Sequence, residues 1–419
     1  MTKSDFLKNS EEKLTALYGA DKTEYAKTRY GAAIDSFIAL YGDGDFDVFS
    51  VPGRTEISGN HTDHNHGEVL AASVDLDIIA VVRRRDDLTV NVKSEGFAPD
   101  CVDISDLAVH AGEKNTSSAL IRGVADGFVK NGYAVCGFDA YTTSDVMGGS
   151  GLSSSAAFED MIGTIFNHYC NGSEIDFLRL SQISQYAENA HFGKPCGLMD
   201  QVACAAGGFV YIDFADTSAP VCRRIPFDIE KHGYKLCIVA TGGSHADLTD
   251  DYASVPAEMK AVASYFGKEY LRGLTTDDIA ANADALRKKF GDRACVRALH
   301  FINENARVEK VAAALDAGDM AGFMALIRES GVSSAMYLQN YYSTKAPAEQ
   351  GITLGCGIAA SLLGTDGAYR VHGGGFAGTI QAFVPVDKLD LFISRMEIAF
   401  GKGSVTVLNI RADGAIKVG

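Results

Sequence analysis

The sequence predicts an α+β protein built from two domains. Its 419 residues exceed the size at which a single hydrophobic core stops growing, so two cores are expected. Segments with helical periodicity alternate with short apolar strands that can pair with near neighbours, a pattern typical of α+β folds. The pattern of elements changes after about residue 220. We therefore expect an N-terminal domain over residues 1–220 and a C-terminal domain over residues 221–419.

The N-terminal elements follow from the spacing of apolar residues. Residues 10–40 have helical spacing, with Leu14, Leu17 and Tyr18 on one face. A glycine-rich loop leads into another helical segment, which begins near Ser153. The remaining predicted elements are helices over 117–130 and 175–189, and strands over 46–51, 69–83, 88–92, 137–143 and 209–214.

The C-terminal half reads as a long helical region followed by strands. Helical spacing, interrupted by glycines, continues from residue 257 to residue 326. Strands are predicted over 236–241, 380–384 and 405–410, and a second glycine cluster, Gly373-Gly-Gly375, precedes the second of them. We find no repeats and no low-complexity linker.

Charge and composition exclude several classes of partner. The formal net charge is −16, and no basic segment offsets it, so we expect no nucleic acid and no anionic membrane as partner. The most apolar stretch, residues 69–82, is too short to span a bilayer. Nine scattered cysteines and a polar N-terminus indicate reduced thiols and a cytoplasmic protein. We expect small-molecule partners only, and a monomeric chain.

The stretch Val146-Met-Gly-Gly-Ser-Gly-Leu-Ser-Ser-Ser-Ala-Ala157 has the form of an anion site. Glycines let the backbone approach a phosphate closely, and the following helix presents free N–H groups and the positive end of its dipole. The alternative is an ordinary capped helix that follows a loop. This stretch alone does not identify the phosphate.

A second polar cluster lies in a glycine-bounded segment, which we interpret as a short turn. It contains Arg54, Asn60, His61, Asp63, His64 and Asn65 within residues 53–67. Such side chains suit a polyhydroxylated ligand, because each hydroxyl group needs a donor and an acceptor. Two alternatives remain open: a metal site formed by His61, Asp63, His64 and His66, and a solvated loop.

These stretches together resemble the motifs of the GHMP kinases, which act on sugars, homoserine, mevalonate and phosphomevalonate. Residues 53–65 resemble the galactokinase signature G-R-x-N-L-I-G-E-H-T-D-Y-N, and residues 146–156 resemble the family's P-x-G-x-G-L-S-S-S-A. Residues 372–378 resemble its third motif, T-G-G-G-F-G-G. Glu188 with residues 195–201 is similar to E-x(7)-C-G-I-M-D-Q, and residues 303–307 match a helical stretch of the family. The order and spacing agree from about residue 45 to residue 410.

The resemblance implies a fold and a set of roles. The fold would pair an N-terminal domain like domain 2 of ribosomal protein S5 with a ferredoxin-like C-terminal domain. Asp200 would be the catalytic base, Arg54 would stabilise the transferred phosphoryl group, and Ser155 and Glu188 would hold Mg²⁺. The implied ATP-binding residues are Ser94, Gly148, Gly149, Ser150, Gly151, Leu152, Ser153, Ser154, Ser155 and Gly374. The implied sugar-binding residues are Asn60, His61, Thr62, Asp63, Gly197, Asp200 and Tyr252.

Several residues of the first motif depart from the family pattern, and two of these substitutions change whether a side chain carries a charge. Asn60 stands where the family has glutamate, and Glu56 stands where it has asparagine. In the family, that glutamate is expected to accept a hydrogen bond from the terminal hydroxymethyl group of the sugar. A neutral Asn60 would not repel a carboxylate at that position of the sugar. The substitution therefore suggests a broadened or shifted sugar preference.

The expected function is an ATP-dependent sugar-1-kinase with galactose as its first candidate substrate. One alternative keeps the chemistry and changes the sugar, for example to galacturonate, arabinose or an N-acetylhexosamine. Another is a non-catalytic sugar sensor, since some galactokinase relatives bind a regulator and are altered in the serine loop. Residues 153–157 are complete here, and Arg54, Glu188 and Asp200 are present, which favours the kinase.

Overall fold

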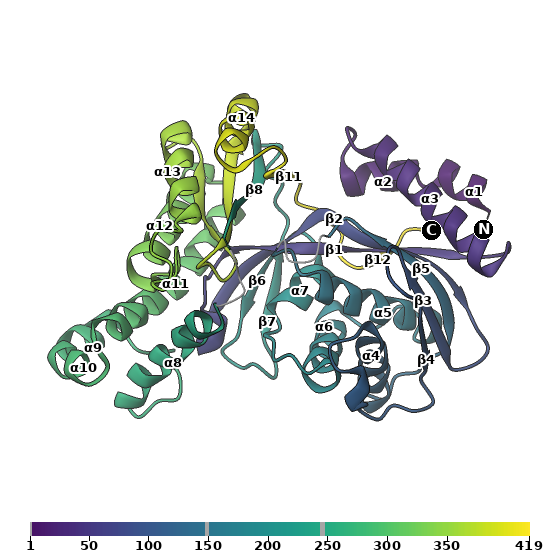
Figure 1. Ribbon diagram of the computed structural model, residues 1–419, viewed down its shortest axis with the longest axis horizontal. Coiled ribbons are helices and arrows are strands. Elements are labelled where there is room, and N and C mark those ends of the chain that lie inside the picture. The colour runs from purple at the N-terminus through teal and green to yellow at the C-terminus, as the bar shows by residue number, and fades with distance from the viewer. Residues whose placement is uncertain (1, 147–150, 244–247) are drawn as a thin grey trace. The chain divides into compact units, whose positions relative to one another are not determined.

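The computed structural model describes residues 2–146, 151–243 and 248–419 (Figure 1). Contacts divide the chain into two compact units. Unit 1 contains residues 1–54, 72–208 and 411–419, and unit 2 contains residues 55–71 and 209–410. The last long segment of unit 2 begins after Gly208, and the boundary expected near residue 220 stays a prediction. The units are discontinuous in sequence, however, because residues 55–71 group with the C-terminal half and residues 411–419 group with the N-terminal half.

Unit 1 is organised around most strands of an eight-stranded sheet. The long strands β1 and β2 of this sheet continue into unit 2, and its strands β6 and β7 belong to unit 2. Its main path has the order β12-β1-β2-β5-β3-β4, while β6 pairs with β2 and β7. Strand β3 is parallel to β5, whereas β2 and β5, β3 and β4, and β6 and β7 are antiparallel pairs. The strands are β1 (Asp47–Ser58), β2 (Glu68–Arg84), β3 (Thr89–Ser94), β4 (Asp100–Asp103), β5 (Phe138–Ser144), β6 (Phe209–Asp213), β7 (Val221–Ile225) and β12 (Ile416–Lys417).

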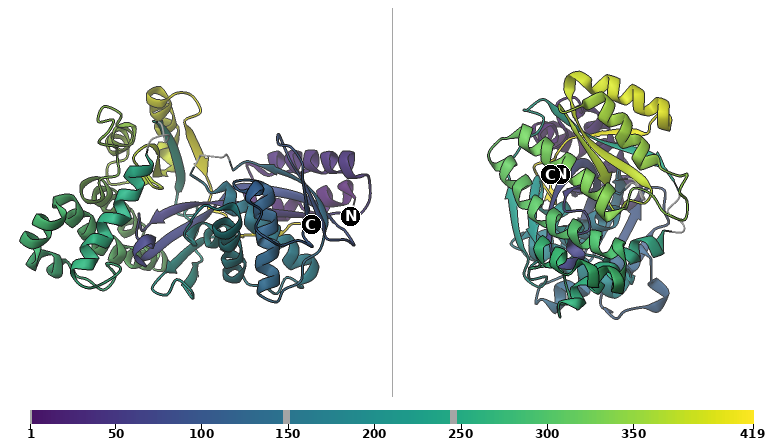
Figure 2. Two further views of the ribbon diagram at one scale, coloured as in Figure 1. Left: turned by 60° about the horizontal axis from the view of Figure 1, so that its bottom comes forward. Right: turned by 90° about the vertical axis from the view of Figure 1, so that its left-hand side faces the viewer.

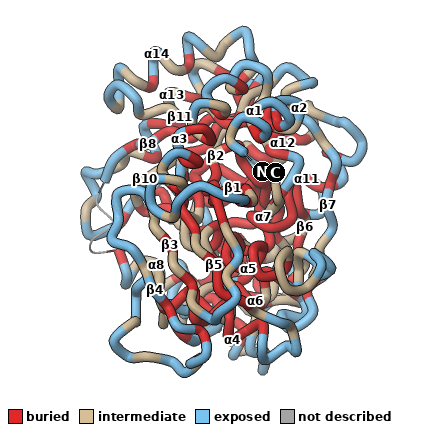
Figure 3. Tube along the Cα trace, turned by 90° about the vertical axis from the view of Figure 1, so that its right-hand side faces the viewer, coloured by how far each residue is buried: buried red, intermediate tan, exposed pale blue. Residues whose placement is uncertain are grey.

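Helices cover both faces of this sheet in unit 1 (Figure 1). Helices α1–α3 lie on one face, and α4–α7 lie on the other. The strands between them are therefore buried along most of their length (Figure 3). The helices are α1 (Lys3–Asn9), α2 (Glu11–Tyr18), α3 (Thr23–Tyr41), α4 (Ser117–Lys130), α5 (Ser154–Cys170), α6 (Phe177–Tyr186), the π-helical turn η3 (Ala187–Phe192) and α7 (Met199–Ala206).

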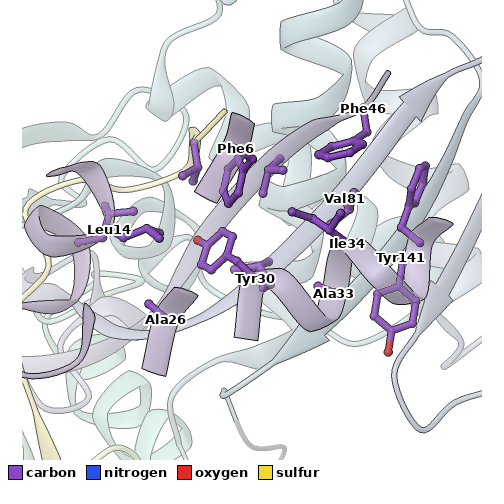
Figure 4. Packing of buried hydrophobic residues seen from close by; sticks show 14 of the residues in the cluster. Phe6, Leu14, Ala26, Tyr30, Ala33, Ile34, Phe46, Val81 and Tyr141 are labelled. Atoms are coloured by element: carbon purple, nitrogen blue, oxygen red, sulfur yellow. The ribbon is translucent and has the colours of Figure 1, made fainter. Parts of the chain in front are cut away.

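The N-terminal helices form a core of their own against β1, β2 and β5. The rings of Phe6 and Tyr30 stack with centroids 5.6 Å apart, and Ile34 and Val81 are fully buried beside them (Figure 4). The predicted helical face containing Leu14, Leu17 and Tyr18 is buried in this core. A fully buried side chain of this size contributes about 1.5–3 kcal/mol, so the three helices are firmly attached to the sheet.

A four-stranded antiparallel sheet and two groups of helices form unit 2 (Figure 2). The sheet has the order β11-β8-β10-β9, and side chains of β10 alternate between its faces. Phe383 packs edge-on against Phe323 of α12, whereas Val384 shares a core with α13 and α14. The strands are β8 (Tyr234–Gly242), β9 (Ala368–His372), β10 (Gly378–Pro385) and β11 (Val405–Leu408).

The long helical region predicted over residues 257–326 is a series of separate helices. Helices α8–α11 share a core that includes Met259, Leu286 and Phe301. The helices of unit 2 are α8 (Thr249–Tyr265), α9 (Thr276–Ala281), α10 (Ala283–Phe290), α11 (Asp292–Asp316), α12 (Met320–Ser333), α13 (Gly351–Leu363) and α14 (Leu389–Phe400). None of the described helices is long and apolar enough to cross a bilayer.

One expectation about local structure was wrong. The polar segment that begins at Gly53 was predicted as a turn, but its first half continues strand β1 to Ser58. Thr55, Ile57 and Ser58 are all fully buried there. Polar strand residues can be buried because other segments satisfy them: the hydroxyl of Thr55 bonds to Gln381, and that of Ser58 bonds to Glu304. The turn itself starts at Gly59.

Candidate active site

The glycine–serine loop enters helix α5 through a left-handed backbone turn. Gly151 has φ 75° and Ser153 has φ 59°, after which the helix starts at Ser154. Positive φ is uncommon for a serine and commonly marks a functional or strained position. Of the predicted phosphate-binding residues, Gly148, Gly149 and Ser150 lie outside the described residues.

Arg54 and Asp200 form a bidentate ion pair within unit 1. Arg54 lies on β1, and its Nε and Nη2 donate to the two carboxylate oxygens of Asp200 at 2.8 and 2.7 Å. Asp200 lies in the first turn of α7. The parallel geometry of two charge-assisted bonds fixes both side chains. The backbone N–H of Arg54 also donates to the carbonyl of Leu152, which ties the strand to the serine loop.

The hydroxyl group of Ser153 donates to Asp200 as well. Burial raises the pKa of Asp200, but the Arg54 guanidinium and the hydrogen bonds from Arg54 and Ser153 outweigh it and hold that pKa below its usual value. Asp200 is therefore ionised at neutral pH. The structure thus brings together three residues predicted from separate motifs: Arg54, Ser153 and Asp200.

A second group of polar side chains gathers around Glu188 in unit 1. The hydroxyl of Ser155 donates to Glu188 Oε1 at 3.2 Å, and Lys194 Nζ donates to the same oxygen at 2.9 Å. Gln201 Nε2 lies 3.0 Å from both Glu188 Oε2 and Glu159 Oε2. Burial, and then the neighbouring Glu188 carboxylate, raises the pKa of Glu159 well above its usual range. The two predicted metal ligands, Ser155 and Glu188, are therefore side by side.

Three more predicted residues of unit 1 occupy distinct positions. Ser94 ends strand β3, and its Oγ accepts a hydrogen bond of 2.9 Å from Thr142. Leu152 is buried at the entry to α5. Gly197 is exposed in the segment before α7. The structure gives them positions, and their roles stay predictions.

The segment predicted to bind the sugar, residues 59–65 (the sugar motif), forms a tight turn in unit 2. Thr62 is buried, and its hydroxyl bonds to the carbonyls of Gly59 and Glu68, so this side chain closes the turn. Asp63 starts a 3₁₀ turn over residues 63–65 and remains partly exposed. Its carboxylate accepts a hydrogen bond of 2.9 Å from the backbone N–H of His64.

His61 presents a buried acceptor that has no protein partner among the described residues. Its Nε2 lies 2.9 Å from the carbonyl oxygen of Gly374, so Nε2 must carry the proton. The other ring nitrogen, Nδ1, is buried without a hydrogen-bond partner. Burial, and then the charge of His64, lowers the pKa of His61 to about 4. At neutral pH His61 is therefore a neutral ring with an unused acceptor.

The second glycine cluster is held against Tyr252 and Asn340 in unit 2. The hydroxyl of Tyr252 donates to the carbonyl of Gly375 at 3.0 Å. A side chain at Gly374 would lie 2.5 Å from the Tyr252 ring, and one at Gly375 would lie 2.3 Å from the carbonyl of Asn340. Gly375 also has φ 81°. Only glycine fits these two positions without rearrangement.

Asn60 is fully buried, and the protein satisfies its side-chain amide. Its Nδ2 donates to Glu56 Oε1 at 3.1 Å and to the carbonyl of Gly373 at 2.8 Å. Its Oδ1 accepts from Asn340 Nδ2 at 2.8 Å and from Ser334 Oγ at 3.3 Å. An amide offers two donors and two acceptor positions, so all four are in use. The predicted contact between Asn60 and a sugar is not visible in this arrangement.

Three residues that support the motif received no role in the sequence analysis. His300 Nε2 donates to the backbone carbonyl of Asn60 at 2.9 Å, and Glu304 accepts from the backbone N–H of Gly59 at 3.0 Å. The buried Arg370 donates to Glu56 Oε1 at 2.7 Å. Residues 303–307 were noticed only as a family-like stretch. No local signal reveals these contacts, because the partners are more than two hundred residues apart.

The alternative of a histidine metal site in the motif finds no support in the structure. No group of three or more His, Cys, Asp or Glu side chains in the described parts of the chain is arranged to hold a metal ion. His66 instead stacks on Tyr270 with ring centroids 3.8 Å apart.

A separate cavity of about 860 Å³ in unit 2 is lined by Phe376, Ala377 and neighbouring segments, but not by the predicted sugar residues.

Two parts of the chain match known family models. Residues 35–84 match the galactokinase galactose-binding signature, and residues 119–208 match the N-terminal domain of GHMP kinases. A galactokinase of Streptomyces coelicolor is 31% identical over 376 residues, which cover 88% of this chain and 92% of that protein. A galactokinase of Clostridium tetani is 30% identical over 372 residues, with 87% and 91% coverage.

Two solved structures of similar fold are a galactokinase and a mevalonate kinase. The galactokinase of Lactococcus lactis, complexed with galactose, has a TM-score of 0.78 at 23% identity, over 93% of this chain and 100% of that chain. The mevalonate kinase of Methanococcus jannaschii has a TM-score of 0.61 at 12% identity, over 88% and 99%. At these identities the likeness establishes the fold, which is the α+β fold of GHMP kinases.

Proposed function

This chain belongs to the galactokinase family of GHMP kinases, and we propose that it transfers the terminal phosphoryl group of ATP to the anomeric hydroxyl group of galactose. It is a phosphotransferase with an alcohol group as acceptor. The observation that carries the proposal is the bidentate Arg54–Asp200 pair, with Ser153 bonded to the same carboxylate at the entry to α5. This transfer needs a carboxylate that accepts the proton and, next to it, a helix N-terminus that can bind phosphate.

In the proposed reaction Asp200 accepts the proton of the anomeric hydroxyl. The sugar oxygen then bonds to the terminal phosphorus of ATP, the bond from that phosphorus to the bridging oxygen breaks, and ADP leaves. Arg54 keeps Asp200 ionised and places a fixed guanidinium near the charge that develops on the phosphoryl group. General-base assistance of this kind is worth roughly 10²–10⁴ in rate.

The nucleotide would bind at the start of α5. Residues 151–155 offer backbone N–H groups and the positive end of the helix dipole to the phosphates. We propose Ser94 and Gly374 as further nucleotide contacts. Gly148, Gly149 and Ser150 remain in the proposal on the strength of the motif alone.

Ser155 and Glu188 fit a magnesium ion. They place two hard oxygen donors 3.2 Å apart, and Glu188 is buried in an ion pair with the exposed Lys194. Mg²⁺ typically takes one or two protein ligands and completes its shell with phosphate oxygens and waters. When bound, the ion would neutralise charge on the nucleotide phosphates.

The sugar would bind to side chains of residues 59–65 that have hydrogen-bonding positions left for a ligand. His61 Nδ1 is a buried acceptor suited to a sugar hydroxyl, and the partly exposed carboxylate of Asp63 offers a second acceptor. Tyr252 and Gly197 complete the proposed set. Thr62 closes the turn through its hydroxyl, so its proposed contribution is to shape the site.

A panel of sugars assayed for ADP release with ATP and Mg²⁺ tests the function. We expect galactose to give the highest kcat/KM. Galacturonate, arabinose and N-acetylgalactosamine test the alternative that the neutral residue at position 60 has changed the substrate. Release of ADP with another sugar at least tenfold faster than with galactose would replace the substrate and keep the chemistry. Tight galactose binding without turnover of any sugar would instead indicate a sensor.

A further inference from the structure

Two of the departures from the family motif, at positions 56 and 60, are reciprocal, and their side chains touch. The family pattern has asparagine at the position of Glu56 and glutamate at the position of Asn60, so the same two residue types are present in exchanged places. Asn60 Nδ2 donates to Glu56 Oε1 at 3.1 Å. We propose that Glu56 and Asn60 are one exchanged pair which, together with Arg370, positions the glycine cluster Gly373–Gly375 for phosphoryl transfer. This inference rests on the proposed kinase function.

The surroundings of Asn60 require a neutral amide. Two of its neighbours, Glu56 Oε1 and the Gly373 carbonyl, can only accept hydrogen bonds, and both receive one from Nδ2. A glutamate at position 60 beside Glu56 would bring two buried carboxylates together and leave the Gly373 carbonyl without its donor. Both changes are costly in a buried site. Position 60 can therefore be a carboxylate only if position 56 is not.

The surroundings of Glu56 require its carboxylate to be negatively charged. Arg370 is fully buried, donates to Glu56 Oε1 at 2.7 Å through Nη2, and donates to the carbonyl of Ile57 at 2.8 Å through Nη1. Removing one partner of a buried ion pair leaves an uncompensated charge. In this chain Glu56 supplies the carboxylate that balances the charge of Arg370. As in the family pattern, positions 56 and 60 together supply one carboxylate and one amide.

The pair reaches the glycine cluster through a short series of hydrogen bonds. Asn60 donates to the carbonyl of Gly373 at 2.8 Å, and Asn340 Nδ2 lies 3.0 Å from the carbonyl of Gly374 while it also donates to Asn60. His61, the neighbour of Asn60, donates to the same Gly374 carbonyl at 2.9 Å. The position of the cluster thus depends on the neutral amide. Glu56, Asn60 and Arg370 are positioning residues, and Asn60 has no group left to bind the sugar.

A double-mutant cycle tests the exchange. The variants are Glu56→Asn, Asn60→Glu and the double variant Glu56→Asn/Asn60→Glu, each measured for Tm and for kcat/KM with the sugar and with ATP. We expect Asn60→Glu to lower kcat/KM by roughly 100-fold or more, and the double variant to regain at least about tenfold of that loss together with about half of the lost Tm. If the losses of the two single variants simply add in the double variant, the proposed pairing of Glu56 and Asn60 is overturned.

A matched control separates positioning from stability. Glu258 is another arginine-paired glutamate of unit 2, bonded to Arg297 at 3.0 Å and to Arg293, and it is not part of the network. We expect Glu258→Gln to lower Tm while kcat/KM stays within about threefold of the wild type. If the folded exchange variants also keep kcat/KM within that range, the pair is structural only and the positioning role is overturned.

The cycle remains decisive in two difficult cases. If Asn60→Glu does not fold alone, recovery of a folded double variant is the expected rescue, and its failure to fold contradicts the pairing. If the wild-type protein phosphorylates no sugar, the proposed function fails, while the Tm cycle still measures the coupling of the two side chains. Turnover of galactose with additive losses would leave the function standing and remove only this inference.

Discussion

At the scale of single residues, the site depends on which side chains are charged and which are neutral. Asp200 is held ionised by Arg54, whereas burial keeps His61 neutral at pH 7. Both states suit the proposed roles, because a base must be deprotonated and an acceptor nitrogen must be free of its proton. The surroundings of each side chain therefore set the charge state that its proposed role needs.

The lowered pKa of His61 predicts a loss of stability in mild acid. Between pH 6.5 and about pH 4 the unfolded chain binds a proton at this histidine and the folded chain does not, so the free energy of unfolding falls as the pH falls. The contribution is at most about 3 kcal/mol. Denaturant unfolding at pH 7, 6 and 5 measures it.

The variant His61→Asn tests this assignment. We expect a shallower pH dependence than in the wild type, with part of the slope remaining because burial also lowers the pKa of His300. His232 is exposed, and His232→Gln is the matched control that should leave the slope unchanged. An unaltered slope in His61→Asn would show that this ring does not titrate as proposed.

At the scale of elements, the turn at the second glycine cluster requires glycine. We expect Gly375→Ala to cost about 1–3 kcal/mol, because its φ is 81° and the added Cβ would lie 2.3 Å from the Asn340 carbonyl. It should also lower kcat/KM, since the cluster is held by these contacts. Among the described residues, no atom lies within 4 Å of a Cβ added at Gly357 in α13. Gly357→Ala is therefore the control, with stability unchanged or raised by up to about 1 kcal/mol. Equal effects of the two changes on Tm and kcat/KM would contradict this reading.

The sequence predicted the periodic elements and the main chemical residues, but not the network beneath them. The buried face of Leu14 and Leu17 and the helix after Ser153 follow from local spacing and capping signals. Motif resemblance brought Arg54, Asp200, Ser155 and Glu188 into the candidate site. Strand β1 beyond Gly53 and the Glu56–Arg370 pair could not be predicted, because distant partners satisfy their polar groups.

At the scale of the whole molecule, the proposed functions are divided between the two units. The pair Arg54–Asp200 and the serine loop belong to unit 1, while the sugar motif and the second glycine cluster belong to unit 2. The sequence neighbours Arg54 and Thr55 fall in different units because strand β1 runs through both. A division of the chain at a single residue therefore does not separate the two sets of functional residues.

The most direct test of the central claim compares the wild type with Asp200→Asn. With galactose, ATP and Mg²⁺, phosphorus NMR should show galactose 1-phosphate and ADP in equal amounts from the wild type. Asp200→Asn should lower kcat by roughly 10²-fold or more, because the amide cannot accept the proton and no longer forms an ion pair with Arg54. ATP binding should be largely kept, because the backbone N–H groups at the start of α5 are unchanged. Asp139→Asn, which alters an aspartate paired with Arg85 in the same unit, is the control. No phosphorylated galactose from the wild type, or less than about a tenfold loss in Asp200→Asn, would contradict the account.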